Sequence, residues 1–137
     1  MEVVLKVKVL AHVCFYVEDL IKTYDFYVKI IGLKHVFDFT NEKGDSYGYF
    51  LHAGGRTFLE FFQGDYDPHA SASCRHICFE VESLIEAKEQ LMDHGIEMSN
   101  LKKGKDNVSS GIVHDPDGNI VEFHEYSKDS LQWKALR

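Results

Sequence analysis

The chain has 137 residues, of which 45% are hydrophobic and 27% are charged, a balance typical of one globular domain. A net charge of −7 without a basic stripe argues against nucleic-acid binding. No apolar run approaches the roughly 20 residues that span a bilayer, and residues 1–13 lack the apolar core of a signal peptide, so we expect a cytoplasmic protein with no membrane partner. The three cysteines fit reduced thiols rather than a disulfide framework.

The first half of the chain predicts a strand, a helix and three more strands. Residues 12–17 alternate apolar with polar side chains, as in a strand with one buried face. An amphipathic helix is expected near residues 19–31. The pair Gly54-Gly55 is typical of a two-residue hairpin turn, here between strands 47–53 and 56–62.

The second half predicts the same order of elements. After its first strand, Ser83 and Glu86 have the spacing of a capping box that begins a helix, and Gly95 is placed to end it. The segment Asp115-Pro-Asp-Gly118 predicts a turn between the last two strands.

These elements predict an α+β domain over residues 1–137, built from two tandem βαβββ modules with a helix on one face of each sheet. Module one covers about 8–63, a linker covers 64–73, and module two covers about 74–126. The tail at 127–137 is expected to add a short helix.

The two modules are copies of each other in sequence. Residues 12–21 and 76–85 are identical at seven of ten positions, at a constant offset of 64. Residues 58–62 and 120–124 align at an offset of 62 and place a Glu over a Glu. A His and a Glu therefore recur at equivalent positions, which indicates an internal repeat.

Strand alternation predicts that four polar side chains lie on the sheet faces away from the helices. The apolar residues of both opening strands suit the helix-covered face, so His12 and His76 are expected on the other. Glu60 and Glu122 stand between apolar neighbours, where an unpartnered buried carboxylate is costly. Two imidazoles and two carboxylates suit a divalent ion such as Ni²⁺, Zn²⁺, Co²⁺, Mn²⁺ or Fe²⁺, with open positions for substrate. We therefore predict these four residues as ligands of one metal.

Each of these residues also has an ordinary structural interpretation. A single strand His or Glu is often a hydrogen-bonded or edge residue, and only the recurrence of both types favours a metal. Cys14 and Cys78 recur on the same face, either as small packing residues or within a Cys/His zinc site. His124 is expected on this face as well, either as a hydrogen-bond donor beside the metal or as a packing residue.

Hairpin pairing adds candidates for a substrate pocket. Counting outward from the Gly-Gly turn, Tyr49 is expected opposite Glu60 and Tyr47 opposite Phe62, and opposed residues share a face. The same aromatic side chains fit a packed core equally well. The candidate pocket residues are Tyr16, Tyr47, Tyr49, Phe58, Phe62 and His124.

The residues around the four predicted ligands resemble the vicinal oxygen chelate superfamily, which includes glyoxalase I, methylmalonyl-CoA epimerase, fosfomycin-resistance proteins and extradiol dioxygenases. The resemblance implies paired modules that form a cupped mixed sheet around one metal, with the helices on the convex face. The matching residues are His12 with Val17-Glu-Asp-Leu20, Phe26-Tyr27 with Gly32-Leu33, Glu60, His76, and Asp115-Pro-Asp-Gly-Asn-Ile-Val-Glu122.

By this resemblance, His12, Glu60, His76 and Glu122 fall on the metal-ligand positions of glyoxalase-I-like members. Dioxygenases of the superfamily normally lack a Glu at the position of Glu60, so the resemblance implies a lyase or isomerase similar to lactoylglutathione lyase. Such an enzyme moves a proton next to a carbonyl of a metal-chelated substrate through an enediolate, with Glu60 or Glu122 as the base. An Fe-dependent extradiol-type dioxygenase and a non-enzymatic small-molecule-binding or resistance protein are the alternatives.

Two positions depart from bacterial glyoxalase I, which has an Arg and an Asn there that help bind glutathione. This chain has Tyr16 and Gly64 instead. A small carbonyl or hydroxy compound other than a glutathione adduct is therefore at least an equal candidate for the substrate. The resemblance also implies a homodimer in which the first module of one chain shares its site with the second module of the other.

Overall fold

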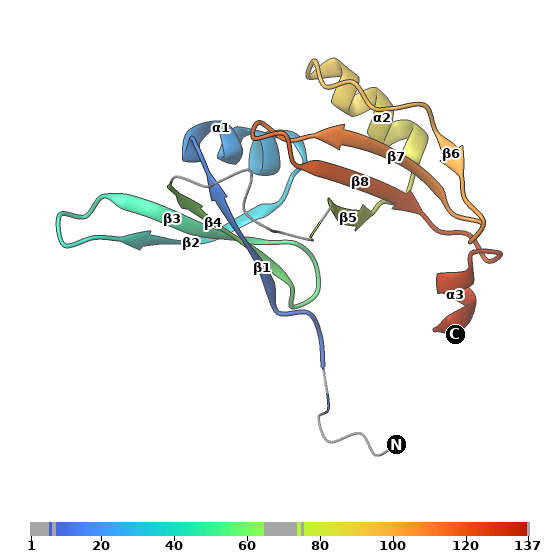
Figure 1. Ribbon diagram of the computed structural model, residues 1–137, viewed down its shortest axis with the longest axis horizontal. Helices are drawn as coiled ribbons and strands as arrows, with labels where there is room; N and C mark the ends of the chain where they lie inside the picture. Colours follow the sequence, from blue (N-terminus) through green and yellow to red (C-terminus); the bar gives the residue numbers. More distant parts are fainter. Residues whose placement is uncertain (1–5, 7, 65–73, 75, 137) are drawn as a thin grey trace. The chain divides into compact units, whose positions relative to one another are not determined.

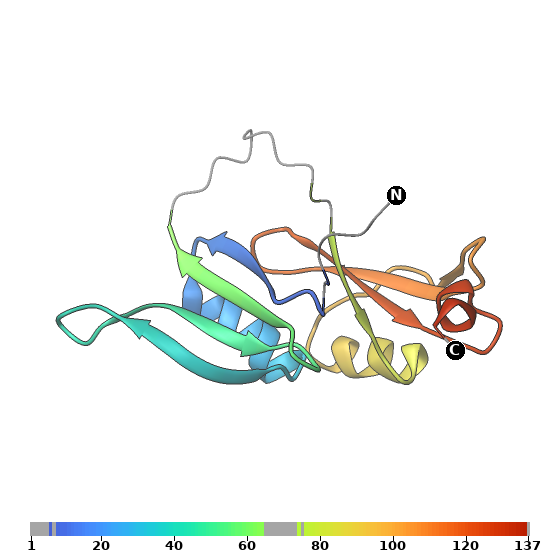
Figure 2. The same ribbon diagram turned by 90° about the horizontal axis from the view of Figure 1, so that it is seen from below.

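The computed structural model describes residues 6, 8–64, 74 and 76–136. It confirms the predicted α+β class and divides the chain into two compact units, Met1–Ala70 and Ser71–Arg137, called here the first and second unit. Each contains one four-stranded mixed sheet with a helix along one face, which Figure 2 shows for each unit. Apart from Gly64, the predicted linker 64–73 lies outside the described residues.

The sheet of the first unit has the strand order β1-β4-β3-β2. β1 is parallel to β4, and the other neighbours are antiparallel, so the first and last strands of the module lie side by side (Figure 1). This order places the two strands that carry the predicted metal ligands of the module, His12 and Glu60, next to each other. The strands are β1 (His12–Val17), β2 (Lys34–Thr40), β3 (Ser46–His52) and β4 (Phe58–Gln63).

The helix of the first unit begins where the sequence predicts. The Asp19 carboxylate accepts hydrogen bonds from the backbone N–H groups of Ile21 and Lys22, at 2.9 and 3.1 Å, which caps the first turn. The α-helix α1 (Leu20–Tyr24) then continues as a π-helical segment, η1 (Asp25–Ile30). It buries Phe26 and Tyr27, and the Tyr27 ring packs on Phe61 of β4 with centroids 4.9 Å apart.

The second unit repeats this topology with the strand order β5-β8-β7-β6. β5 is parallel to β8, as β1 is to β4. The strands are β5 (His76–Glu80), β6 (Lys102–Lys103), β7 (Ser109–His114) and β8 (Ile120–Glu125), and the helices are α2 (Leu84–Asp93) and α3 (Leu131–Ala135). The short helix α3 confirms the helix expected in the tail. None of the described helices is long and apolar enough to cross a membrane.

The predicted helix start at Ser83 and the predicted turn at Asp115 are confirmed in the second unit. The Ser83 hydroxyl accepts from the backbone N–H of Glu86 at 3.2 Å, and the Glu125 carboxylate adds a second cap by accepting from Leu84 N–H at 2.7 Å. The Asp115 carboxylate accepts from the N–H groups of Asp117 and Asn119, at 2.9 and 2.8 Å. These bonds hold the turn that leads into β8.

The hairpin between β3 and β4 corrects one prediction. Ala53 N–H donates to Thr57 at 2.9 Å, so the loop has three residues, not the two expected from Gly54-Gly55. The register therefore shifts by one residue, and a shift of one residue exchanges the two faces. Tyr49 lies opposite Phe61, and Phe50 lies opposite Glu60.

The burial of Tyr49 follows from this register. Its side chain is on the helix-covered face, is 4% exposed, and donates from its hydroxyl to the Leu20 carbonyl at 2.7 Å. The prediction that Tyr49 lies opposite Glu60 and shares its face is therefore wrong. The predicted pairing of Tyr47 with Phe62 is wrong as well, because Gly48 lies opposite Phe62. A signal in the sequence pointed to the true register: Gly48 lies opposite Phe62, whose ring occupies the space of a Cβ, with Cδ1 2.5 Å from that position.

Candidate functional site

In the first unit, the predicted donors His12 and Glu60 lie close together on the sheet face away from α1. The parallel register places Cys14 opposite Glu60 and His12 opposite Phe58. His12 Nε2 is 3.7 Å from Glu60 Oε1, and the two side chains are 45% and 15% exposed. The alternation argument is thus confirmed for this pair, which reaches solvent on the imidazole side.

The Cys14 thiol lies against the Glu60 carboxylate. Burial, a hydrogen bond to Glu60 and the charge of Glu60 raise the pKa of this thiol to about 11. The thiol is therefore protonated at neutral pH, and it acts as a hydrogen-bond donor beside the carboxylate.

Aromatic side chains surround the His12–Glu60 pair, and the sequence analysis missed a central one. Phe50, opposite Glu60, has its ring centroid 5.4 Å from that of His12. Phe62 lies between Tyr16 and Tyr47, with centroid distances of 5.8 and 6.0 Å. Further rings join this aromatic face: Phe37, Phe39 and Phe58.

In the second unit, the predicted donors are arranged differently. His76 lies opposite Ile120, and the residue directly opposite Glu122 is Cys78. Glu122 Oε1 is in direct contact with His124 Nε2 from the same strand. His76 therefore shares the strand face with Glu122, but the close imidazole partner of Glu122 within the described second unit is His124.

Cys78 completes a group of three donor side chains. Its sulfur, a carboxylate oxygen of Glu122 and a ring nitrogen of His124 all lie within 4.8 Å of one another. Burial, followed by the charge and hydrogen bond of Glu122, raises the pKa of the Cys78 thiol to about 12. Each unit thus pairs a protonated thiol with the carboxylate of its central Glu.

The donor chemistry fits a divalent transition metal. Imidazole nitrogen, carboxylate oxygen and cysteine sulfur are the ligand types of zinc and its neighbours, and they occur here within a few ångströms on one face of each sheet. The use of all four predicted ligands by one ion stays a prediction, because the two pairs belong to different units.

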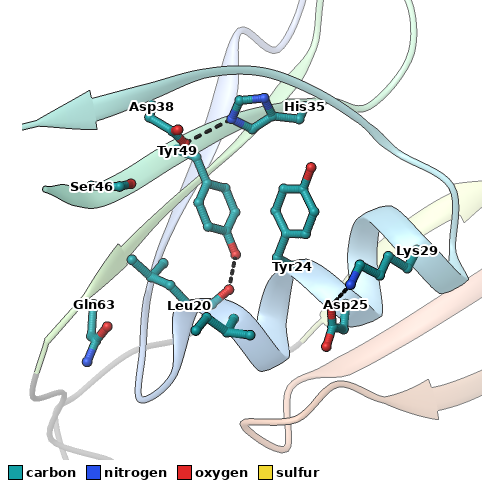
Figure 3. A pocket seen from close by; sticks show the side chains of 10 residues that line it. Leu20, Tyr24, Asp25, Lys29, His35, Asp38, Ser46, Tyr49 and Gln63 are labelled. Atoms are coloured by element: carbon teal, nitrogen blue, oxygen red, sulfur yellow. Dashed lines mark hydrogen bonds and ion pairs between the residues drawn. The ribbon is translucent and has the colours of Figure 1, made fainter. Parts of the chain in front are cut away.

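A pocket of about 560 Å³ lies elsewhere in the first unit, between its helix and the β2–β3 hairpin (Figure 3). Tyr24 and Tyr49 line it together with His35, whose Nε2 is 2.9 Å from Asp38 Oδ1. None of the four predicted metal ligands lines this pocket. Tyr49 does so from the helix side, as its corrected register requires.

Comparisons with known proteins agree with this architecture. The family model described as the Glyoxalase/Bleomycin resistance protein/Dioxygenase superfamily matches residues 9–123. Comparison with curated proteins gives no match.

Solved structures of similar fold carry different functional descriptions. A glyoxalase family protein from Enterococcus faecalis is 30% identical, with a TM-score of 0.72 over 86% of this chain and 98% of its own. A lactoylglutathione lyase from Agrobacterium tumefaciens is 22% identical, with a TM-score of 0.65 over 85% and 92%. TnmS3, an antibiotic binding protein from Streptomyces sp. CB03234, is 21% identical, with a TM-score of 0.70 over 90% and 99%. The last two show the fold alone.

Proposed function

The chain belongs to the Glyoxalase/Bleomycin resistance protein/Dioxygenase superfamily, and from that membership we propose that it is a divalent-metal-dependent lyase or isomerase that moves a proton next to a carbonyl of a small substrate. The observation that carries the proposal is the His12–Glu60 pair, with 3.7 Å between Nε2 and Oε1 on an open, aromatic-lined face. Its counterparts in the repeat are His76 and Glu122. We propose these four residues as the metal ligands.

The metal, when bound, would polarise the substrate carbonyl and stabilise the negative charge left by proton loss. Glu60 supplies a carboxylate that is 15% exposed and close enough to His12 for both side chains to bind the same metal ion. We assign to Glu60 the role of base, because the Phe50 ring directly opposite it limits solvation of the carboxylate. The Cys14 thiol, which donates to this carboxylate, would hold it in position.

The substrate proposed here is a small carbonyl or hydroxy compound other than a glutathione adduct. A Cβ added at Gly64 would lie 3.3 Å from the Tyr16 ring, so the two departures from bacterial glyoxalase I are in contact. An Asn at position 64 would need the Tyr16 ring to shift by a few tenths of an ångström. Tyr16 also carries no charge with which to bind a carboxylate of glutathione, which supports a different substrate.

Replacing Glu60 by Gln tests the proposed base. The amide keeps the size and hydrogen-bonding shape of the carboxylate but cannot accept the proton, so turnover is expected to fall by about 10²- to 10⁴-fold. The assay is a screen of small carbonyl compounds and hydroxy acids against the metal-loaded protein, with heat-unfolding curves to show that the fold is intact.

A matched control is Glu42→Gln, which removes an exposed carboxylate in the loop between β2 and β3. It is expected to retain full turnover. Undiminished turnover in Glu60→Gln would refute the role assigned to this residue.

A binding protein without catalysis is the second candidate function. The aromatic face around Phe50 and Phe62, with Tyr47 stacked on Phe62, is suited to hold a planar molecule by stacking. Tight binding of an aromatic compound by the metal-free protein, unchanged by Glu60→Gln and lost in Phe50→Ala, would favour this function over the enzyme.

A further inference from the structure

The second unit contains a cluster of three potential metal ligands, Cys78, Glu122 and His124, that has no exact counterpart in the first unit, although the two units are copies in sequence. Cys14 and Glu60 are paired across β1 and β4, as Cys78 and Glu122 are across β5 and β8. Two residues further along the last strand, the first unit has Phe62 and the second has His124. The second unit therefore has an imidazole next to its central Glu on the same strand, where the first unit has a phenyl ring that cannot bind a metal.

The three side chains of the second unit come from two hydrogen-bonded strands, so the backbone holds their positions. Sulfur, carboxylate oxygen and ring nitrogen lie within 4.8 Å of one another. Neighbouring donors of a tetrahedral zinc ion lie about 3.3 to 3.8 Å apart, given bonds of about 2.0 to 2.3 Å. Small side-chain rotations therefore suffice to place all three on one ion.

His124 gives a second, separate indication. Its Nε2 contacts Glu122, while its Nδ1 is buried and has no hydrogen-bond partner among the described residues. Such a buried, unpartnered nitrogen is costly in a structural His. A metal ion bound to the imidazole would give this side chain a partner that the described residues do not supply.

We propose that Cys78, Glu122 and His124 form a metal site of the second unit by themselves, selective for zinc-like ions that accept sulfur as well as nitrogen and oxygen. Three ligands from the chain leave one position of a tetrahedral ion for water or substrate. The thiolate ligand favours Zn²⁺ or Co²⁺ over Mn²⁺ or Mg²⁺. This inference shares Glu122 with the proposed function but uses neither His12 nor His76.

The test uses the full chain, stripped with a chelator and reloaded with Co²⁺. A cobalt ion bound to a cysteine thiolate has a sulfur-to-metal charge-transfer absorption in the near ultraviolet, and binding through imidazole and carboxylate alone does not. The unsubstituted protein is expected to show this absorption. Cys78→Ser should abolish it, and His124→Phe, which installs the residue of the first unit, should weaken cobalt binding by about tenfold or more.

Cys14→Ser is the matched control, because Cys14 is the repeat partner of Cys78 and should not affect the absorption. His12→Ala should also leave it intact, which separates this inference from the four-ligand site of the proposed function. If cobalt binds without the charge-transfer absorption, and if this binding is lost in His12→Ala, the result would support the four-ligand site and overturn the inference. An absorption that disappears in Cys14→Ser would overturn it as well.

A measurement on the unsubstituted chain covers the case in which Cys78→Ser fails to fold. Zinc should slow alkylation of Cys78 by iodoacetamide at least tenfold and leave the alkylation rate of the exposed Cys74 unchanged. Peptide mass spectrometry measures both rates. Equal alkylation of Cys78 with and without zinc would refute the site.

Discussion

The thiols beside the central glutamates have unusual chemistry for exposed cysteines. Cys14 and Cys78 are both reached by solvent, yet burial of their sulfur atoms and the adjacent carboxylates raise their pKa values to about 11 and about 12. The reacting species of a cysteine is the thiolate. These two residues should therefore be slow to react although they are accessible.

A prediction for Cys14 in metal-free protein follows. A pKa two units above the ordinary value of 9.0 leaves about a hundredfold less thiolate near neutral pH, so alkylation should be about a hundredfold slower than for an ordinary thiol. The rate should rise about tenfold per pH unit and level off only near pH 11. Iodoacetamide labelling in excess chelator, read by peptide mass spectrometry across pH 7 to about 10, measures this.

Glu60→Gln serves as the internal comparison for this rate. Removing the negative charge lowers the pKa of Cys14 only in part, because burial is the largest cause of the shift. Labelling should therefore become several-fold faster, still short of an ordinary thiol. A labelling rate that levels off near pH 9 in the unsubstituted protein would contradict the burial argument.

The β3–β4 hairpin shows how one element decides which residues face the site. Alternation was sufficient to assign the faces of β1, β4, β5 and β8, because each assignment needed only the strand's own sequence. The face of Tyr49 depended on its partner strand, and the three-residue loop set that register. Counting from a Gly-Gly pair failed because this sequence suits a two-residue or a three-residue loop.

Tyr49→Phe tests the corrected register at this scale. The hydroxyl donates to the Leu20 carbonyl at 2.7 Å on the buried face, so its loss should lower the free energy of unfolding by about 1 kcal/mol. Metal affinity should not change, because the ring lies on the face opposite Glu60. Urea unfolding and metal titration measure the two quantities.

Tyr47→Phe is the control for this substitution. Tyr47 is 48% exposed and contacts Phe62 through its ring, so removing its hydroxyl should alter stability by less than about 0.5 kcal/mol. A metal affinity that falls in Tyr49→Phe would place Tyr49 on the Glu60 face after all.

At the scale of the whole molecule, duplication explains both the fold and the difference between the units. Two βαβββ copies each bury an apolar face under a helix and leave the other face, on which a His, a Cys and a Glu recur, uncovered by that helix. Copies that keep the same backbone can change single side chains, as the Phe62 and His124 positions illustrate. Chemistry specific to one unit can thus arise without a change of fold.

The proposed homodimer leads to a test by mixing chains. If the His12 and His76 of one metal site come from different chains, a heterodimer of His12→Ala and His76→Ala has one site with both imidazoles and one site with neither. Mixed and refolded variants should then regain about a quarter of the unsubstituted turnover, since half the dimers carry one intact site of two. Sedimentation at micromolar concentration should give the mass of a dimer.

No recovery of turnover on mixing, with dimers formed, would place both imidazoles of a site in one chain. A monomeric mass with full metal occupancy would reject the homodimer.

The sequence by itself determined the repeat, the order of the elements, the helix caps, the turn before β8, and the faces of the strands that carry His12, Glu60, His76 and Glu122. These features depend on the side-chain period within one segment, which adjacent residues specify. Only the tertiary structure decided which residues lie opposite one another. It placed Phe50 at Glu60, buried Tyr49 under the helix, and gathered Cys78 and His124 at Glu122. Register and side-chain contact depend on the partner strand and its loop, which the pattern of a single strand does not contain.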